Sequence, residues 1–405
     1  MIISRLILKN WKNFQSVDIP LNPRTFIMGP NGIGKSNLLD ALRFLADIAR
    51  PEGGLSFALQ IRGGLEKIKF SAAKKKEAVE LEVHLADSVL SGTYYRYSLG
   101  ITADPSGSPR LAYERVRKSG ELILNRPDRM DASNATSPDK TYLETVKSTT
   151  IRTVSISTNN DIQELANFLG SISYLNFNPI LFRHQDPFPP ADIPGDPFGR
   201  KILQRAAKMP APEREKRMRI IDDILKVAVP QMPKLRFAPS DKSDSLSLEG
   251  TFDIGRPRAK YGQDKFSDGT LAAFAVLWSY WEDDPLLILE KPEVYLNSGT
   301  IHRLCLIMYM GSAMAGKKQL IISTHCAEFL KHDLYPIKPK EIILLATGSY
   351  KEGTKAFLAS DISQIVEDME NGMSADEAVP HYARPMDLVE MLSEFMDSGH
   401  DMDDE

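Results

Sequence analysis

The string GPNGIGKS, residues 29–36, limits the possible folds more than any other stretch of the sequence. It fits the pattern G-x-x-x-x-G-K-[S/T], follows the apolar segment TFIM (25–28) and opens an amphipathic segment. Glycines allow backbone N–H groups to curl around phosphate oxygens in conformations that a Cβ would obstruct. The motif therefore predicts a strand, a phosphate-binding loop and a helix, with Lys35 reaching the β- and γ-phosphates and Ser36 ligating Mg²⁺.

The bulk properties are those of an ordinary globular protein, with 42% hydrophobic and 26% charged residues. No apolar run approaches the ~20 residues of a membrane span, and the N-terminal MIISRLILKN is typical of a strand rather than a signal peptide. Cys305 and Cys326 form neither a metal-binding spacing nor a disulfide framework. We therefore expect a cytoplasmic protein with no membrane partner.

The net charge of −4 excludes a uniformly basic nucleic-acid binder, but the charge is uneven along the chain. Residues 67–76 (KIKFSAAKKK) and 199–219 are basic, whereas 397–405 (DSGHDMDDE) is acidic. Each basic run is either a solvated face or a surface that follows phosphates, so nucleic acid is a possible partner.

The N-terminal part of the chain shows strand and helix patterns in quick succession. The segments 3–10, 16–21 and 24–29 are typical of short strands, and apolar spacing predicts a helix over 35–49. Alternation of apolar and polar residues over 78–124 predicts an antiparallel sheet.

Helices are expected again over 200–227, and from residue 268 helices and apolar strands alternate. The expected order is helix, strand, helix, strand, helix, strand, over 269–281, 285–290, 299–314, 318–324, 326–332 and 341–347. Apolar strands without alternation, each followed by a helix, indicate a parallel sheet that is buried on both faces.

The fold class is therefore α/β, with a nucleotide-binding core assembled from both ends of the chain and residues from about 50 to 260 inserted. The segments 125–140 and 183–199, rich in Pro, Asp and Ser, are expected to be exposed loops. The predicted division is 1–100 and 261–360 for the two parts of the core, 101–260 for an inserted region, and 361–405 for a helical tail with an acidic end.

The nucleotide is expected to be ATP, bound with Mg²⁺. A guanine site would require N-K-x-D, and the nearest string, NRPD (125–128), has Arg126 in place of the lysine. The cofactors are therefore predicted to be ATP and Mg²⁺.

Four strings occur in the order of the motifs of ABC-type ATPases: GPNGIGKSN (29–37), FSDGTLAAFAVL (266–277), LLILEKPE (286–293) and IISTHCAEFL (321–330). More narrowly, the sequence resembles the RecF/SMC-like branch with a compact head and no long coiled coil, which includes the OLD-type heads. LKNWKNF (8–14) and QIRGG (60–64) add to the resemblance. It implies an ABC-type P-loop ATPase head with a mixed or antiparallel β lobe and a partly helical insertion.

The resemblance also implies roles for particular residues. The cofactor-binding loop would comprise Gly29, Pro30, Asn31, Gly32, Ile33, Gly34, Lys35, Ser36 and Asn37. Ser267, Asp268 and Gly269 match the signature motif, which in relatives contacts the γ-phosphate held by the other subunit of a head-to-head homodimer. Ser267 would also suit the N-cap of the following helix.

Further assignments follow from the same resemblance. His325 matches the switch histidine that reaches the γ-phosphate. Asn10, Lys12 and Asn13 resemble a loop that touches the base and sugar, and Gln60 resembles the glutamine that senses metal and water.

The end of the strand 286–290 departs from the family pattern, in which two acids follow one another. Glu290 fits the first, which holds Mg²⁺ through water together with Ser36, but Lys291 stands where the second would activate the attacking water. A lysine beside a triphosphate stays protonated and cannot act as the base. Either hydrolysis is slow, or Glu293 takes over the role; Lys291 itself is either a natural departure or a substitution that traps the bound state.

The sequence thus supports an ATP-gated dimeric switch whose partner is a nuclease or toxin-like effector, in anti-phage defence or toxin control by analogy. The alternatives are a RecF-like DNA-binding repair ATPase and a scaffold that binds ATP without hydrolysing it. No nuclease module is expected after about residue 360.

Overall fold

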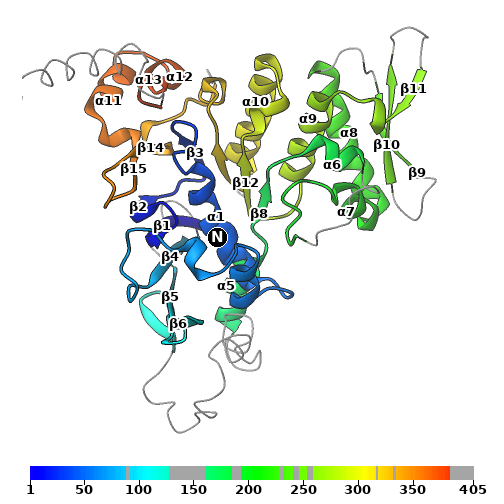
Figure 1. Cartoon of the computed structure of the whole chain (residues 1–405). Helices are drawn as coiled ribbons and strands as arrows, with labels where there is room; N and C mark the ends of the chain where they lie inside the picture. Colours follow the sequence, from blue (N-terminus) through cyan, green and yellow to red (C-terminus); the bar gives the residue numbers. More distant parts are fainter. Residues whose placement is uncertain are drawn as a thin grey trace, which may run out of the picture.

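Three β-sheets flanked by helices make up the described part of the chain (Figure 1). The computed structural model describes residues 1–87, 92, 94–126, 160–184, 193–228, 232, 234–239, 246–252, 259–315, 318–331 and 334–383. Residues 127–140 and 185–192 of the two predicted loops, and the acidic tail, lie outside these ranges. Within them, no helix is both long enough and apolar enough to cross a membrane.

The first sheet is antiparallel, with the strand order β2-β1-β4-β5-β6-β7. Its strands are β1 (Ile2–Trp11), β2 (Phe14–Pro20), β4 (Val79–Ala86), β5 (Tyr95–Ala103), β6 (Pro109–Lys118) and β7 (Glu121–Arg126). Alternate residues of β4, such as Val79, Leu81 and Val83, are fully buried. The antiparallel sheet predicted from the alternation over 78–124 is therefore confirmed.

The second sheet is the core, with the order β15-β14-β3-β13-β12-β8. Its strands are β3 (Arg24–Met28), β8 (Ser173–Leu175), β12 (Leu286–Glu290), β13 (Gln319–Ser323), β14 (Ile342–Thr347) and β15 (Thr354–Leu358). All neighbours pair in parallel except β14 and β15. The predicted assembly of this core from both ends of the chain is confirmed, and β8 adds a strand from within 101–260.

Each face of the core sheet packs into a different hydrophobic cluster. Leu286 and Ile288 of β12 join the cluster that also contains α1 (Lys35–Ala49), α5 (Asn160–Gly170) and the inner face of the antiparallel sheet. Leu287 and Leu289 join the opposite cluster. Burial on both faces explains why these strands are continuously apolar in the sequence.

The opposite cluster is covered by helices from the inserted region and from the C-terminal part. They are α7 (Ile202–Lys208), α8 (Ala211–Ala228), α9 (Asp268–Tyr280) and α10 (Ser298–Ala315). A small third sheet, β9 (Lys234–Pro239), β10 (Leu246–Phe252) and β11 (Ala259–Gly262), lies beside α8 and α9 (Figure 1). Shorter helices are α2 (Leu55–Gln60), α3 (Leu65–Ile68), α6 (Pro179–Arg183), α11 (Ser363–Glu370), α12 (Ala375–Ala378) and α13 (Pro380–Ala383).

The prediction of a helix over 326–332 is wrong for the residues described there, 326–331. They form only a 3₁₀ turn, Ala327–Phe329. Thr324 Oγ1 accepts a hydrogen bond from Cys326 N, and the buried Tyr309 hydroxyl donates to Phe329 O. The backbone bonds here join residues three positions apart, from Phe329 N to Cys326 O and from Leu330 N to Ala327 O, which is the 3₁₀ pattern.

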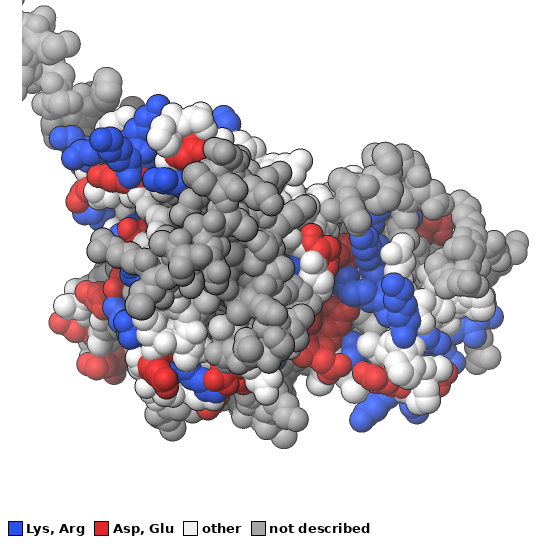
Figure 2. Space-filling view, turned by 90° about the horizontal axis from the view of Figure 1, so that it is seen from below, with Lys and Arg blue, Asp and Glu red and all other residues white. Residues whose placement is uncertain are grey.

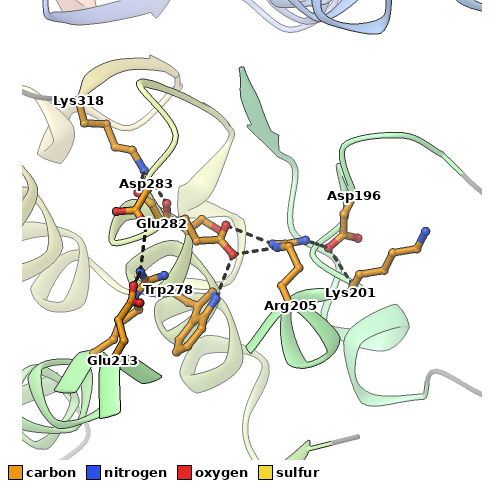
Figure 3. A network of polar contacts seen from close by, with 10 residues as sticks. Asp196, Lys201, Arg205, Glu213, Trp278, Glu282, Asp283 and Lys318 are labelled. Carbon is orange, nitrogen blue, oxygen red and sulfur yellow. Dashed lines mark hydrogen bonds and ion pairs between the residues drawn. The ribbon is translucent and has the colours of Figure 1, made fainter. Parts of the chain in front are cut away.

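A polar network fastens the inserted helices to the loop that joins α9 to β12 (Figure 3). Arg205 of α7 donates to Glu282 at 2.8 Å and to Asp196 at 2.6 Å, and Trp278 Nε1 also donates to Glu282, at 3.1 Å. Lys318 Nζ donates to three carbonyls of this loop region. The network lines a hollow of about 850 Å³ on the underside, where acidic and basic side chains lie beside one another (Figure 2). The network thus holds the end of α9 and the loop that leads from α9 to β12.

Gln319 ties the antiparallel sheet to the core sheet. β2 ends opposite Arg5, so Ile3 of β1 lies beyond it. At Ile3 the fully buried Gln319 side chain makes the hydrogen bonds that β2 no longer provides. Its amide oxygen accepts from Ile3 N at 2.9 Å, and its amide nitrogen donates to Ile3 O at 2.8 Å and to Asn22 O at 3.0 Å.

Gln319→Leu should therefore lower the free energy of unfolding by about 2–4 kcal/mol, because buried backbone groups lose their partners. Urea unfolding followed by circular dichroism measures the change. Gln364→Leu removes an exposed glutamine that bonds only to Asp368 and should change stability by less than about 0.5 kcal/mol. Equal effects of the two substitutions would contradict the bridging role of Gln319.

Candidate nucleotide-binding site

The loop between β3 and α1 has the backbone shape that its glycines predict. Gly29, Gly32 and Gly34 have φ angles of 147°, 77° and 112°. A Cβ on Gly34 would lie 2.1 Å from Asn13 Nδ2, and one on Gly29 would lie 2.7 Å from Leu345 O. Glycine is therefore required at both positions by conformation and by space.

Unpaired backbone donors line this loop. Within the described part of the chain, no hydrogen bond is made by the backbone N–H groups of residues 31–36. They sit at the N-terminus of α1, where the helix contributes a partial positive charge. Such an array of free donors suits the phosphate groups of a nucleotide.

Lys35 is 4% exposed, and its ammonium group lies against the loop. Its Nζ donates to Gly29 O at 2.6 Å and to Pro30 O at 2.8 Å. Burial, with a smaller effect from Lys291, lowers the pKa of Lys35 to about 8. A bound phosphate would supply the missing negative charge and favour the charged form of Lys35.

Asn13 braces the loop from behind. Its Nδ2 donates to Ile33 O at 2.8 Å and to Thr354 Oγ1 at 2.7 Å, and its Oδ1 accepts from Asn37 at 2.7 Å. Asn10 donates to Ala78 O, and Lys12 pairs with Asp40 at 2.7 Å. These contacts give the three residues structural partners, so their contact with base and sugar stays a prediction.

The Glu290 carboxylate at the end of β12 meets the phosphate-loop helix. Ser36 Oγ donates to Glu290 Oε1 at 2.5 Å, although the two residues are 254 positions apart. Glu290 is 6% exposed, and the Tyr174 hydroxyl of β8 donates to its other oxygen, Oε2. Burial and Glu290 raise the pKa of Tyr174, so its hydroxyl stays protonated. Tyr174 is not predicted from the sequence, because a three-residue strand gives no periodic signal.

The arrangement of Ser36 and Glu290 fits Mg²⁺. Mg²⁺ prefers oxygen ligands, and Ser36 and Glu290 offer a hydroxyl and a carboxylate. In nucleotide hydrolases the ion is commonly bound by one or two such side chains together with the phosphates of the nucleotide. When bound, Mg²⁺ would neutralise phosphate charge. No group of three or more His, Cys, Asp or Glu side chains suited to a metal occurs among the described residues.

Two more basic residues, Lys291 and His325, lie at this end of the sheet. His325 Nδ1 lies 3.4 Å from Lys35 Nζ. Burial, followed by Lys35 and then Lys291, lowers the pKa of His325. Lys291 is half-buried and has φ 48°, a left-handed conformation that is uncommon outside glycine and is found at functional sites. The lowered pKa favours the uncharged form of His325, and an anion bound beside Lys35 and Lys291 would offset the repulsion between these two lysines.

Glu293, the alternative base, is held on one side only. Its Oε1 accepts from His325 N at 2.9 Å, whereas Oε2 is buried without a described partner. Burial raises the pKa of this carboxyl group. Glu293 therefore supports the loop that carries His325, and one of its oxygens stays unused.

The signature residues form a separate site in the single chain. Ser267 Oγ caps α9 by accepting from Thr270 N at 3.1 Å, and a Cβ on Gly269 would lie 2.8 Å from Tyr295 O. Arg183 of α6 donates to Asp268 Oδ1 at 2.6 Å, a contact that the sequence did not predict. Among the described residues, no hydrogen bond joins Ser267–Gly269 to the phosphate loop.

Gln60 is the exposed last residue of α2. In the described structure its side chain makes no hydrogen bond to the phosphate loop. Its role as a sensor of metal and water stays a prediction.

Comparison with known proteins agrees with this geometry. The family described as "AAA domain, putative AbiEii toxin, Type IV TA system" matches residues 24–330. The DNA replication and repair protein RecF of Corynebacterium jeikeium is 37% identical over 87 residues, 21% of this chain and 20% of that protein. Endonuclease GajA of Bacillus cereus is 49% identical over 47 residues, 12% of this chain and 8% of that protein. The chain therefore aligns with a fifth or less of the length of these relatives.

A solved structure supports the fold. The SMC head bound to the C-winged helix domain of ScpA aligns with a TM-score of 0.53 and 15% identity, over 88% of this chain and 98% of that one. At this identity the likeness concerns the fold alone. The ABC-type head fold expected from the motifs is confirmed.

Lys35→Ala should abolish ATP binding, because the loop loses the ammonium group that would face the phosphates. Isothermal titration calorimetry with ATP and Mg²⁺ measures the affinity. Lys226→Ala, which removes a lysine paired with Asp222 on α8, should bind ATP like the unchanged protein. Unchanged affinity in Lys35→Ala would overturn the assignment of this loop.

Proposed function

Since the chain belongs to the AAA-domain family that its residues 24–330 match, we propose that it is an ATP-gated switch of the RecF/SMC/OLD type. ATP with Mg²⁺ binds between the phosphate loop and Glu290. Two heads then close on the nucleotides, and the closed state acts on a partner protein. Hydrolysis, which reopens the heads, is slow.

The observation that carries this proposal is the position of Lys291. Lys291 directly follows Glu290, and its charge contributes to the lowered pKa of both Lys35 and His325. Beside a triphosphate its ammonium group stays charged, so it neutralises the γ-phosphate and cannot accept a proton. Phosphoryl transfer depends on positioning and electrostatics, so some hydrolysis remains. The balance favours a long-lived ATP-bound state.

Dimerisation is supported by the separation of the two half-sites. Ser267 and Asp268 are exposed, and within one chain they make no hydrogen bond to the phosphate loop. A second copy facing the first would bring its signature helix N-terminus to the γ-phosphate, where a hydroxyl and free N–H groups bind anions. Each nucleotide would then lie between two subunits.

The partner is proposed to be a nuclease or toxin-like effector, and the setting anti-phage defence or toxin control. Support comes from the description of the family as a putative toxin of a type IV toxin–antitoxin system and from the endonuclease and RecF relatives. The related SMC head binds a partner protein, ScpA. Cys305 and Cys326 are both free, which fits a reducing cytoplasm.

One observation favours the alternative of a RecF-like DNA-binding ATPase. Arg96 and Arg117 stand directly opposite each other on β5 and β6, with Arg115 two residues along. In the described structure neither Arg115 nor Arg117 forms an ion pair; they bond to Asn125 and to Gly120 O. Like charges directly opposite one another destabilise a sheet. Glu82 pairs with Arg96 at 3.6 Å and offsets part of this repulsion, and DNA phosphates would offset more of it. Salt-sensitive binding to DNA, lost in Arg115→Ala/Arg117→Ala, would favour this alternative.

Ser267→Arg should prevent ATP-dependent dimerisation, because the larger cation would fill the position of the partner's γ-phosphate. Light scattering with ATP and Mg²⁺ measures the molecular mass, and calorimetry follows the affinity for ATP in the same samples.

The matched control is Ser374→Arg, which removes the N-cap of α12 and leaves the signature motif intact. It should dimerise like the unchanged protein. ATP-dependent association of Ser267→Arg with full ATP affinity would show that the two sites are not shared between subunits.

Lys291→Glu should accelerate ATP hydrolysis by roughly 10²-fold or more, because it restores an acid at the position of the general base. This corresponds to about 2.7 kcal/mol of activation barrier. Phosphate release under saturating ATP measures the rate. Glu290→Ala should instead weaken Mg²⁺-dependent binding and hydrolysis together.

The competing assignment gives a different pattern. If Glu293 is the base, the unchanged protein hydrolyses ATP briskly, Glu293→Gln slows it, and Lys291→Glu brings no gain. That combination would refute slow hydrolysis.

A further inference from the structure

Both oxygens of the Glu290 carboxylate are occupied by hydroxyl donors from different parts of the chain. Ser36 Oγ donates to Oε1 at 2.5 Å, and the Tyr174 hydroxyl donates to Oε2. Ser36 belongs to the phosphate-loop helix and Tyr174 to β8. The two donors therefore hold the carboxylate from opposite directions.

The register of the core sheet delivers Tyr174 to this position. β8 pairs in parallel with β12, and Tyr174 stands opposite Ile288. Because side chains alternate along a strand, Ile288 and Glu290 lie on the same face as Tyr174. An aromatic side chain reaches the diagonal neighbour two residues along, so the Tyr174 hydroxyl meets Glu290 and not Lys291.

The Tyr174 ring is held in place as well. It packs against the hydrophobic cluster beneath α1. The Arg43 guanidinium of α1 lies 5.3 Å from its ring centroid, within the range of a cation–π contact. The helix α1, which carries Ser36, therefore also helps to hold the ring of Tyr174 and with it the hydroxyl.

We propose that Tyr174 is the positioning residue that aims Glu290 at the magnesium ion of the bound nucleotide. The inference rests on the proposed Mg²⁺–ATP site and adds a residue that no motif of the chain contains. A glutamate side chain has one more rotatable bond than an aspartate, so its carboxylate needs an external contact to keep one direction. Tyr174 holds Oε2 and leaves Oε1 with Ser36, on the side where the metal would lie. Partners of metal-holding carboxylates commonly change metal affinity by 10- to 100-fold.

The variant Tyr174→Phe keeps the ring, and with it the packing and the Arg43 contact, and removes only the hydroxyl. Calorimetric titration with Mg²⁺ at fixed ATP should give a half-saturating Mg²⁺ concentration raised by about 10-fold or more. The affinity for ATP in excess EDTA should not change, because the phosphate loop is intact.

Tyr113→Phe is the matched control. It removes another tyrosine–glutamate hydrogen bond, from Tyr113 to Glu80 at 3.0 Å, on the antiparallel sheet. Its Mg²⁺ requirement should equal that of the unchanged protein. A double variant extends the comparison: once Glu290→Ala has removed the carboxylate, Tyr174→Phe should add no further shift.

Three outcomes overturn the inference: an unchanged Mg²⁺ requirement in Tyr174→Phe, an equal loss of ATP affinity with and without Mg²⁺, or a full effect that persists beside Glu290→Ala. Failure of the proposed function is distinguishable, because the unchanged protein would then show no Mg²⁺-dependent ATP binding.

Discussion

The hydrogen bond between Ser36 and Glu290 joins two residues that lie 254 positions apart, and the rest of the site is arranged around it. It exists because β3 inserts between β13 and β14, so that the N-terminal strand is hydrogen-bonded to C-terminal strands on both sides. Parallel strands end at the same edge of a sheet, and the phosphate loop, Glu290 and His325 all follow such ends. The core sheet is therefore built from strands of both ends of the chain.

Positive charge is the second constraint on this edge. Lys35 is buried, His325 lies 3.4 Å from it, and Lys291 adds a third basic group. The two lysine charges repel each other, and a bound triphosphate would offset that repulsion. In the proposed function, Lys291 would favour the binding of the nucleotide and would leave its position without a general base, so the ATP-bound state would be retained longer.

The region between the two parts of the core contributes residues that contact the candidate site. β8 extends the core sheet and places Tyr174 on Glu290, while α6, just beyond it, places Arg183 on Asp268 of the signature motif. Further along, Arg205 of α7 bonds to Glu282 in the loop between α9 and β12. Three contacts thus connect the inserted region to Glu290, to Asp268 and to the loop between α9 and β12. A movement of this region would reach both halves of the nucleotide site.

Short stretches of sequence were enough to predict the parts of this protein whose chemistry is local. The glycine conformations of the phosphate loop, the burial of apolar strands on both faces and the alternation of the antiparallel sheet are properties of neighbouring residues, and each was predicted from short strings. The tertiary structure decided what depends on register and on contacts between distant segments. The strand of Tyr174 is three residues long and has no period to detect; Gln319 is a polar residue whose partner lies 316 positions away. The segment 326–332 has helical spacing, but its described residues form a single 3₁₀ turn, and the Tyr309 hydroxyl of α10 donates to Phe329 O in that turn. Local sequence patterns show which face of a helix or strand is buried. Which distant side chain packs against that face, or bonds to a given polar group, depends on the register and packing of the folded chain.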